Sequence, residues 1–368
     1  MRVEVEQSGN RVTVLAGKQT LSYEVEGVTL PELSDFSFAG WAMLPWAMLT
    51  GEDLEIDGPV DAGAMANINK FSRAWELWQP DRFRMVKASG VGTSSITLDR
   101  EDAFVFYSGG LDSTDMLLQR GRCKSRMAAV TVHGFDYAPS AAAQFDGLRQ
   151  MMAPLLEELN YKHIVLRVSE MQGGDHSWAL QLAGAAFLLS GLYREGFFAS
   201  DYTWEQDMIS FPWGLNHVTN RYLSGRNFSL SPQCEERTRV EKAEVVGRHP
   251  VAIKATSFCK RRDTRPHNCG RCSKCMRTKL MFEATLGRQP DIFLDASFDA
   301  GLVRRIDLSS KNERAFFIDL YQAARDRGTI EAIPGLQERF EKMSRGSMQG
   351  RRRLSSFFRR FSSSLGRS

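Results

Sequence analysis

The chain has 368 residues, 42% of them hydrophobic and 25% charged, so it is long enough to bury a sizeable core in two or three domains. No stretch approaches the roughly 18 consecutive apolar residues of a membrane-spanning helix, and the first residues lack the charged-then-apolar plan of a signal peptide. Composition therefore disfavours secretion and membrane spanning, and we expect a cytoplasmic globular protein.

The net charge of +4 has its source in the C-terminal segment. Residues 345–368 contain seven Arg and no acid, which leaves residues 1–344 at −3. The body of the protein is therefore mildly acidic. Because one tail supplies all the positive excess, the charge is no strong signal for nucleic-acid binding.

Residues 1–98 predict a separate α+β unit. Three alternating apolar and polar runs predict a small antiparallel meander, and two helical segments follow. These five segments are 2–6, 11–15, 21–25, 38–49 and 62–78. The unit is rich in Trp, which we expect to pack in its core rather than line a ligand pocket. The residues concerned are Trp41, Trp46, Trp75 and Trp78.

Residues 99–290 predict an α/β domain with a doubly wound parallel sheet, because short apolar runs alternate with helix-length segments. The predicted strands are 103–107, 127–133, 163–168, 196–200 and 251–256. The predicted helices are 111–120, 141–159, 178–194 and 235–247. A helical region follows over 291–344, with helices expected at 313–327 and 333–343.

The most informative motif is the run from Ser108 to Thr114, which joins a predicted strand to a predicted helix. Two glycines let the backbone turn sharply and approach an anion, and the start of the helix presents free N–H groups with a partial positive charge. The motif predicts a phosphate-binding loop made of Ser108, Gly109, Gly110, Leu111, Asp112, Ser113 and Thr114.

Asp112 is unusual in such a loop, because a carboxylate repels phosphate. It is expected to cap the helix, to hold Mg²⁺ or to orient a neighbouring group. The full motif, Ser-Gly-Gly-x-Asp-Ser after an apolar strand, resembles the pyrophosphate loop of the PP-loop ATP pyrophosphatase superfamily. It differs from a Walker loop. The resemblance implies that ATP is split between its α and β phosphates and that AMP is transferred to a substrate oxygen.

Four of the six cysteines fall within 17 residues, which favours a metal site in a reducing compartment over a disulfide framework. They are Cys259, Cys269, Cys272 and Cys275. Four thiolates suit a tetrahedral Zn²⁺ site, and with no position open for water the site would be structural. His267 could replace one ligand, and an iron-sulfur cluster is the alternative.

The phosphate loop followed by this cysteine motif resembles the 7-cyano-7-deazaguanine synthase family, over roughly residues 102–287. Phe135-Asp136-Tyr137 and the segment from Arg239 to Lys242 resemble further family motifs. The resemblance implies an enzyme that activates a ring carboxylate with ATP, replaces AMP with ammonia and dehydrates the amide to a nitrile. It also implies that Cys259, Cys269, Cys272 and Cys275 are zinc ligands.

The departures from the family predict a divergent member. Ala138-Pro139-Ser140-Ala141 stands where the family has Gly-Gln-Arg-His, and residues 173–177 replace its Pro-Gly-Arg-Asn segment. The family also lacks a leading domain of this kind and the helical tail. We therefore expect an ATP-dependent carbon-nitrogen ligase that acts on a small-molecule carboxylate, with a deazaguanine-type heterocycle as one candidate.

The expected cofactors are ATP with Mg²⁺ bridging its triphosphate, and structural Zn²⁺. Asp112 and Lys242 are the candidate catalytic residues, with Lys242 or Arg239 neutralising charge that develops on the transferred phosphoryl group. On a helix surface, a lysine such as Lys242 is more often a solvated charge. His176 is a weak candidate for the substrate site, whereas His133 and His163 are expected to be structural.

Two other functions stay open. A tRNA sulfurtransferase with this loop would need a reactive cysteine, and Cys123 is the nearest to the loop in sequence. A non-catalytic nucleotide-binding module would bind ATP without releasing pyrophosphate.

The tail over 345–368 places apolar residues at helical spacing among its Arg residues. They are Leu354, Phe357, Phe358, Phe361 and Leu365. This pattern predicts a basic amphipathic helix for an anionic membrane surface or a partner, with a disordered tail as the alternative. A homodimer is a further expectation.

Overall fold

The computed structural model describes residues 1–94, 100–121, 127–169, 174 and 176–344. The strands are β1 (Arg2–Ser8), β2 (Arg11–Ala16), β3 (Gln19–Glu26), β4 (Leu54–Ile56), β5 (Ala88–Gly90), β6 (Glu101–Phe106), β7 (Ala128–His133), β8 (Lys162–Val168), β9 (Tyr193–Ala199) and β10 (Ser229–Gln233). Among the described residues they form one sheet in the order β10-β9-β6-β7-β8-β3-β2-β1-β4-β5.

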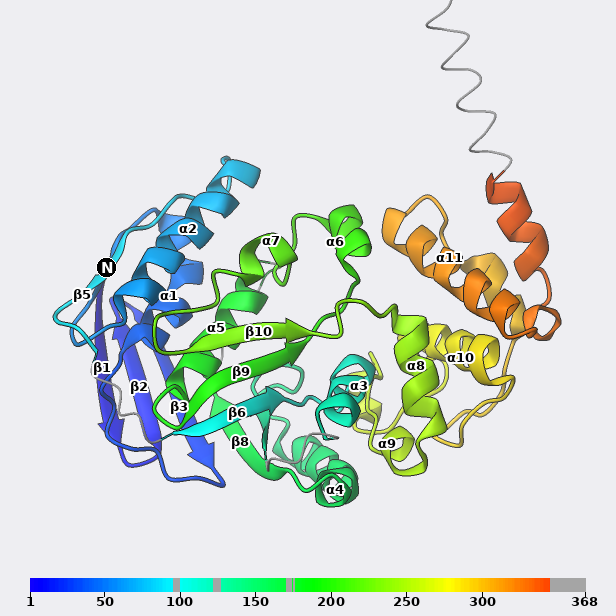
Figure 1. The fold of residues 1–368 in the computed structure, drawn as a ribbon, viewed down its shortest axis with the longest axis horizontal. Coiled ribbons are helices and arrows are strands. Elements are labelled where there is room, and N and C mark those ends of the chain that lie inside the picture. The colour runs from blue at the N-terminus through cyan, green and yellow to red at the C-terminus, as the bar shows by residue number, and fades with distance from the viewer. Residues whose placement is uncertain (95–99, 122–126, 170–173, 175, 345–368) are drawn as a thin grey trace, which may run out of the picture.

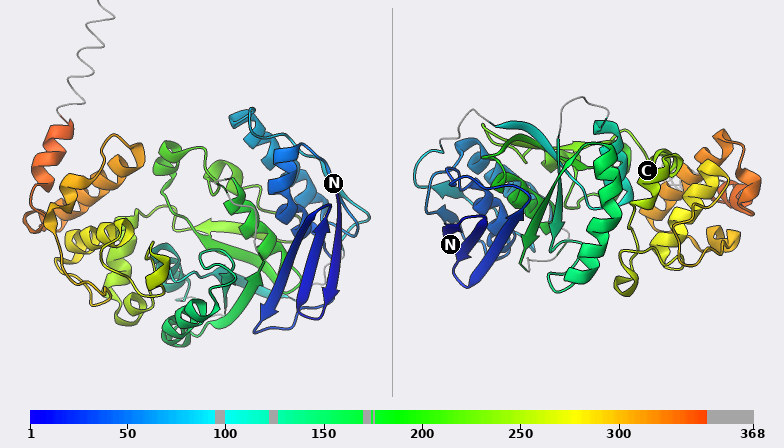
Figure 2. Two further views of the ribbon diagram at one scale, coloured as in Figure 1. Left: turned by 180° about the vertical axis from the view of Figure 1, so that it is seen from behind. Right: turned by 90° about the horizontal axis from the view of Figure 1, so that it is seen from below.

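The longer helices are α1 (Ser37–Thr50), α2 (Ala62–Trp78), α3 (Leu111–Arg120), α4 (Ala142–Glu158), α5 (Ser177–Leu188), α8 (Arg239–Arg248), α10 (Ser273–Leu286) and α11 (Lys311–Asp326). Short helices are α6 (Trp204–Ser210), α7 (His217–Asn220) and α9 (Pro250–Lys254). Residues 336–344 are also helical. The N-terminal strands and the C-terminal helices lie at opposite ends of the molecule (Figures 1 and 2).

The predicted N-terminal meander is confirmed by the antiparallel pairing of β1 with β2 and of β2 with β3. It is not a separate layer, because β3 pairs antiparallel with β8, with Tyr23 opposite Val168. The sheet therefore continues from the meander into the α/β region. Helices α1 and α2 confirm the two predicted helical segments.

Four predicted parallel strands are confirmed as β6, β7, β8 and β9. Strand β7 pairs with one side of β6 and β9 with the other, so the strand order reverses at β6. The arrowheads of β6, β9 and β10 point toward α3 and α8 (Figure 1). At such a reversal the connections leave in opposite directions and leave a crevice at the carboxyl ends of the strands.

The strand predicted over 251–256 is wrong, because residues Pro250–Lys254 form α9. Pro250 occupies the first turn, where its fixed φ suits a helix, and the His249 side chain accepts the Ala252 N–H at 3.2 Å. The edge position beside β9 belongs instead to β10, which tolerates Pro232 because an edge strand has one side without a ladder partner.

The helix predicted over 178–194 extends too far, because α5 ends at Leu188 and β9 starts at Tyr193. Gly191 interrupts the apolar run, and Tyr193 already pairs with Glu101 of β6. The helix predicted over 235–247 begins later, at Arg239, where Thr238 provides the N-cap. The two helices expected in 291–344 are confirmed.

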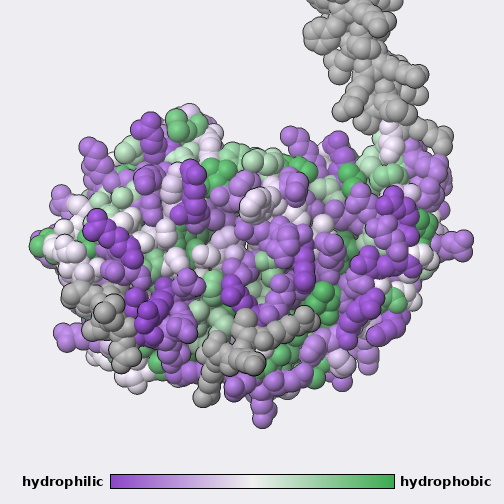
Figure 3. Space-filling view, in the orientation of Figure 1, coloured by the Kyte–Doolittle hydropathy of each residue, from purple (hydrophilic) through white to green (hydrophobic). Residues whose placement is uncertain are grey.

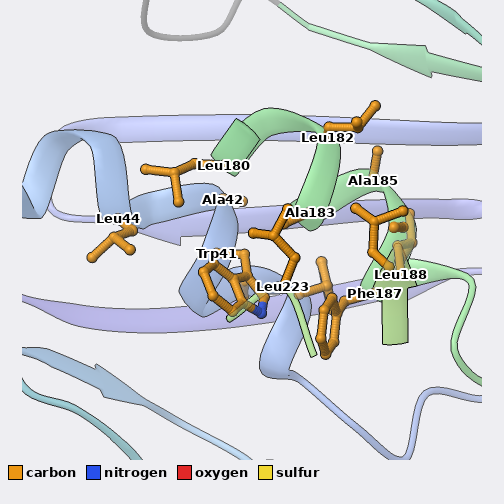
Figure 4. Close-up of a cluster of buried hydrophobic side chains, with 14 of the residues drawn as sticks. Trp41, Ala42, Leu44, Leu180, Leu182, Ala183, Ala185, Phe187, Leu188 and Leu223 are labelled. Carbon is orange, nitrogen blue, oxygen red and sulfur yellow. The ribbon is translucent and has the colours of Figure 1, made fainter. Parts of the chain in front are cut away.

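The core has two parts, one on each face of the sheet. Alternate residues of β6 divide between them: Phe104 and Phe106 face α1, α2 and α5, whereas Val105 faces α3, α4, α8, α10 and α11. Trp41 lies on the first face beside Phe187, with ring centroids 5.8 Å apart (Figure 4). Burial of Trp41 and Trp75 confirms that these Trp residues belong to the core.

The surface seen in Figure 3 is largely hydrophilic, with apolar residues in small scattered patches. None of the described helices has the length and apolar character needed to cross a membrane. The amphipathic helix predicted within 345–368 lies outside the described residues.

Candidate functional site

A cavity of about 420 Å³ opens at the carboxyl ends of β6, β7 and β9. Its wall includes Phe106 and Ala199 at the strand ends, and Asp112 and Ser113 in the first turn of α3. This is the crevice created by the reversal of strand order, which is where open α/β sheets bind ligands. The loop that the sequence singled out therefore borders the cavity.

The loop backbone depends on Gly109, which has φ +72°. A Cβ on Gly109 would lie 3.0 Å from Leu148 Cδ1 and 3.1 Å from Met152 Sδ. Glycine is thus favoured both by the left-handed backbone and by the close approach of α4. The Gly109 carbonyl accepts the Ser257 N–H at 2.7 Å, which ties the loop to the segment after α9.

The three hydroxyls of the loop bond within the loop. Ser108 Oγ lies 3.2 Å from Ser113 Oγ and accepts the Gly110 N–H at 3.3 Å. Thr114 Oγ1 donates to the Gly110 carbonyl at 2.7 Å. Ser108, Gly110, Leu111, Asp112 and Ser113 line the cavity, whereas Gly109 and Thr114 lie buried behind them. The hydroxyls of Ser108 and Ser113 are therefore the loop's side-chain donors at the cavity.

Helix α3 begins at the cavity without a side-chain cap, because Gly110 occupies the N-cap position. The first N–H groups of an uncapped helix need an external acceptor, and the partial positive charge there favours an anion. The first turn of α3 thus has the properties of a phosphate-binding site.

Asp112 is held by two cations. Arg239 Nη2 lies 3.0 Å from Asp112 Oδ2, and Lys242 Nζ lies 3.4 Å from Asp112 Oδ1. Arg239 Nη2 also lies 2.9 Å from Asp201 Oδ1. Of the three roles open to Asp112, the geometry matches the orientation of neighbouring groups, since both of its oxygens are engaged.

The two carboxylates of this network differ in pKa. Burial alone would raise the pKa of Asp112, but Arg239 and Lys242 outweigh it and hold that pKa below its ordinary value. Burial raises the pKa of Asp201, against the opposing effect of Arg239. The charge of Asp112 raises the pKa of Arg239, which keeps the guanidinium charged at the cavity wall.

Lys242 is fully buried and is not a solvated charge on the surface of α8. Its Nζ donates to the Ser200 carbonyl at 2.5 Å and lies behind Asp112, whereas Arg239 lines the cavity. Between the two cations named in the sequence, Arg239 is therefore the one placed to touch a ligand. Lys242 orients Asp112 from the side that faces away from the cavity.

Further cations that the sequence did not single out line the cavity: Arg265, Lys274 and Arg277. Arg265 lies between the first two cysteines of the motif. Lys274 and Arg277 are three residues apart and so share one face of α10. The sequence signal that could have identified these cations is their position within the cysteine motif or directly after it. Within the described part of the chain, the wall also holds the carboxylates of Asp112, Asp136 and Asp201.

The rest of the wall is mostly apolar. Residues predicted from the family motif, Phe135 and Tyr137, contribute to it, and so do Trp178 and Trp213. Leu182 of α5 points away from Trp41, while Ala183 on the same helix points toward it (Figure 4). The cavity therefore combines a charged side beside α3, α8 and α10 with an apolar side beside α5.

The four cysteines of the motif converge into one cluster with all Sγ atoms within 4.8 Å of one another. Cys259 Sγ lies 3.8 Å from Cys272 Sγ, and Cys269 Sγ lies 3.9 Å from Cys275 Sγ. Two sulfurs bound to one Zn²⁺ at about 2.3 Å lie roughly 3.8 Å apart in a tetrahedron. The cluster therefore fits a metal such as zinc. His267 is exposed and takes no part in it.

Backbone N–H groups donate to two of these sulfurs, whereas burial raises the pKa of Cys269 and of Cys275. Cys269 Sγ accepts the N–H of Arg271 at 3.4 Å and of Cys272 at 3.3 Å. Burial alone would raise the pKa of Cys272, but the N–H groups of Cys275 and Lys260 outweigh it and lower the pKa to about 6. Such bonds favour the deprotonated sulfur that a metal requires.

The histidines lie outside the cavity wall. His133 Nε2 lies 3.0 Å from the Ala138 carbonyl, and His163 Nε2 lies 2.9 Å from Thr131 Oγ1, as expected of structural residues. His176 is buried with its ring centroid 4.6 Å from that of Phe83. It does not line the cavity, so it is not placed for the predicted contact with substrate. Cys123 lies outside the described residues.

Comparisons of the chain with protein-family models, with curated proteins and with solved structures found no match. The functional assignment therefore depends on the geometry of the cavity and of the cysteine cluster.

Proposed function

We propose that this chain is an ATP-dependent ligase that adenylates the carboxylate of a small molecule and then forms a carbon-nitrogen bond with ammonia. The observation that carries the proposal is the uncapped start of α3, which opens onto the cavity. The glycine loop and the cationic side chains of α8 and of the cysteine motif line the same cavity. The reversal of strand order at β6 supports a doubly wound fold for this region. The motif resemblance supports a divergent 7-cyano-7-deazaguanine synthase-like enzyme.

In the first step, the loop and the start of α3 hold the β and γ phosphates through N–H groups and the Ser108 and Ser113 hydroxyls. A carboxylate oxygen of the substrate attacks the α phosphorus, the bond to the β-phosphate oxygen breaks, and pyrophosphate leaves. Arg239, oriented by Asp112 and Asp201, faces the negative charge that develops on the transferred phosphoryl group.

In the second step, ammonia attacks the acyl carbon, the bond to the AMP oxygen breaks, and a proton leaves the new amide nitrogen. Dehydration of the amide to a nitrile would take a second ATP: the amide oxygen attacks the α phosphorus, pyrophosphate leaves, the carbon-oxygen bond then breaks so that AMP carries the oxygen away, and the nitrogen loses two protons. The Mg²⁺ that accompanies ATP supplies charge neutralisation on the phosphate oxygens. Asp136 is the cavity carboxylate suited to such an ion, because Asp112 is occupied by Arg239 and Lys242 and Asp201 is paired with Arg239.

The proposal is tested by pyrophosphate release from the full chain, loaded with Zn²⁺ and supplied with Mg²⁺ and ATP. The acceptors are a panel of small carboxylates, a deazaguanine carboxylate among them, with ammonium as the nitrogen donor. Products are identified by mass spectrometry. We expect carboxylate-dependent pyrophosphate release and an amide or nitrile product.

The double substitution Ser108→Ala with Ser113→Ala removes the hydroxyl donors of the loop and should lower pyrophosphate release at least 10-fold, as for lost hydrogen bonds to a charged group. Ser309→Ala, an exposed serine outside the cavity wall, is the control. Zinc content should stay at one per chain in both variants. Unchanged release from the double variant would contradict the nucleotide assignment.

The cysteines that the structure describes favour sulfur transfer to tRNA less than they favour the ligase. Four of them form the metal cluster, and burial raises the pKa of Cys234 to about 12, which suppresses its thiolate. A non-catalytic nucleotide-binding module would show ATP binding without pyrophosphate release in the same assay.

A further inference from the structure

The cysteine cluster and the nucleotide cavity are built from the same stretch of chain. Ser257 and Phe258 precede Cys259 directly, and both line the cavity. Arg265 lies within the motif, and Lys274 and Arg277 follow Cys272 on α10. The segment that we call the knuckle, residues 257–277, therefore supplies part of the cavity wall.

The knuckle also holds the phosphate loop in place. The Ser257 N–H donates to the Gly109 carbonyl at 2.7 Å, and Ser257 Oγ lies 3.1 Å from the Tyr137 hydroxyl. Cys259 is only two residues beyond this contact. A displacement of Cys259 is therefore transmitted to the glycine that shapes the loop.

Two knuckle cations, Arg265 and Lys274, bring positive charge to the cavity, and neither forms an ion pair with a carboxylate in the part of the chain that the structure describes. Arg265 Nε donates to the Cys259 carbonyl at 2.8 Å, and its Nη1 donates to the Asp136 carbonyl. These carbonyl oxygens position the guanidinium without neutralising its charge. Lys274 is exposed at the cavity, in the first turn of α10. The two side chains are suited to a polyanion.

Arg277 is the third knuckle cation and is the most firmly positioned. It forms an ion pair with Glu313 of α11 and lies 4.8 Å above the ring of Phe316. Its charge is partly neutralised by Glu313, so it contributes less to anion binding than Arg265 and Lys274. It fixes the orientation of the α10 face that carries Lys274.

The four thiolates come from two separate pieces of the knuckle. Cys259 belongs to the piece that bonds Gly109, and Cys272 forms the N-cap of α10, where its Sγ accepts the Cys275 N–H at 3.5 Å. A metal ion bound to all four would join these pieces with bonds far stronger than contacts between thiols. The positions of Arg265 and Lys274 depend on that junction.

We propose that the metal-loaded knuckle is a second anion-binding part of the cavity wall, next to the phosphate loop, in which Arg265 and Lys274 bind phosphate oxygens of the nucleotide. The inference rests on the proposed function and goes beyond it, because it makes the metal a determinant of nucleotide affinity as well as of folding. Metal loss would release both cations and loosen the loop through Ser257.

Calorimetric titration of the full, metal-loaded chain with Mg²⁺-ATP and with inorganic pyrophosphate tests the role of the cations. Lys274→Met should weaken both affinities about 10-fold, as expected for one charge-assisted contact to phosphate. Arg261→Met is the matched control, because Arg261 belongs to the same knuckle, is exposed and pairs with Asp263 away from the cavity. Equal affinities for wild type and Lys274→Met would overturn the inference.

Removal of the metal by a chelator tests the role of the cluster. Affinity for Mg²⁺-ATP should fall at least 10-fold and return when stoichiometric Zn²⁺ is added. Far-ultraviolet circular dichroism reports whether the helices and the sheet stay folded. Metal-free protein with an unchanged spectrum and unchanged affinity would contradict the inference, and the Lys274→Met comparison decides it where chelation unfolds the whole chain.

The two proposals fail in different ways. Metal-loaded wild type that binds neither ATP nor pyrophosphate overturns the proposed function and this inference together. Wild type that binds both ligands, with Lys274→Met and metal-free protein binding them equally well, overturns the inference alone.

Discussion

The two charged sides of the cavity are built in different ways. The phosphate loop, residues 108–114, is one continuous stretch between β6 and α3, and its shape follows from Gly109 and from the start of a helix. The knuckle, residues 257–277, is largely irregular chain that leads into α10 and brings four sulfurs together. A local backbone conformation holds the first side, and a metal would hold the second.

This difference predicts different sensitivities. A substitution in the loop changes either the backbone strain of the loop or the buried charges between α3 and α8. Its effect should therefore appear as a lower free energy of unfolding. The knuckle has little regular structure of its own, and its effect on the cavity passes through the cluster. Substitutions in or beneath the phosphate loop should therefore lower the free energy of unfolding more than a substitution on α11, which belongs to neither side.

The largest effect is expected from Asp112→Ala. The substitution leaves Lys242, which is fully buried, and Arg239 without their shared carboxylate. Removing one partner of a buried ion pair typically costs about 3–5 kcal/mol, because the remaining charge stays desolvated. Urea denaturation followed by circular dichroism measures the loss.

Asp263→Ala is the control for this prediction, because Asp263 pairs with Arg261 on the exposed surface of the knuckle. Its denaturation midpoint should match that of wild type. If Asp112→Ala were as stable as Asp263→Ala, the buried charge network beneath the loop would carry no stability.

An intermediate effect is expected from Gly109→Ala. The new Cβ would be strained at φ +72° and would press against Leu148 and Met152 at 3.0 and 3.1 Å. We expect a loss of about 2–3 kcal/mol in the free energy of unfolding, with strain and crowding both contributing. Denaturant titration gives the free energy, and calorimetry should show weaker ATP binding.

Gly17→Ala separates the two contributions, because Gly17 has φ +59° and no other atom within 4 Å of the place that a Cβ would occupy. It should lose only about 1 kcal/mol, from backbone strain alone. Equal losses in the two variants would mean that α4 yields to the new methyl group and that the loop is less closely packed than its geometry indicates.

The smallest effect is expected from Asp319→Asn on α11, away from both sides of the cavity. Burial raises the pKa of Asp319 to about 7 from an ordinary value of 3.8, against the hydrogen bond that Gln206 donates. Between these two values the unfolded chain has lost the proton and the folded chain retains it, so stability falls as pH rises. The substitution should remove this fall, which is at most about 1.4 kcal/mol for each pH unit between the two pKa values.

Urea midpoints at pH 4.5 and pH 8 measure the change. The control is Asp326→Asn on the same helix, whose side chain is exposed and pairs with Arg325. It should keep the pH dependence of wild type. An unchanged pH dependence in Asp319→Asn would show that the carboxyl is ionised in the folded protein at pH 4.5.

Much of the local structure could be predicted from the sequence. The meander, the strand-loop-helix unit around Gly109 and the spacing of Cys269, Cys272 and Cys275 all occur where expected, because each depends on residues close together in the chain. The error at 251–256 arose where an apolar run suited both a strand and a helix, and Pro250 with its His249 cap decided for the helix.

The assembly of the site was decided by tertiary structure. Periodicity predicts which segments are strands but not which strands become neighbours, so neither the pairing of β3 with β8 nor the reversal at β6 was visible. The burial of Lys242 behind Asp112 and the place of Lys274 at the cavity depend on how α8 packs on α3 and on how α10 packs on α8. The sequence by itself determined the glycine loop and the set of four cysteines; packing on one face of the sheet decided that the loop and the cations of the cysteine motif border one cavity.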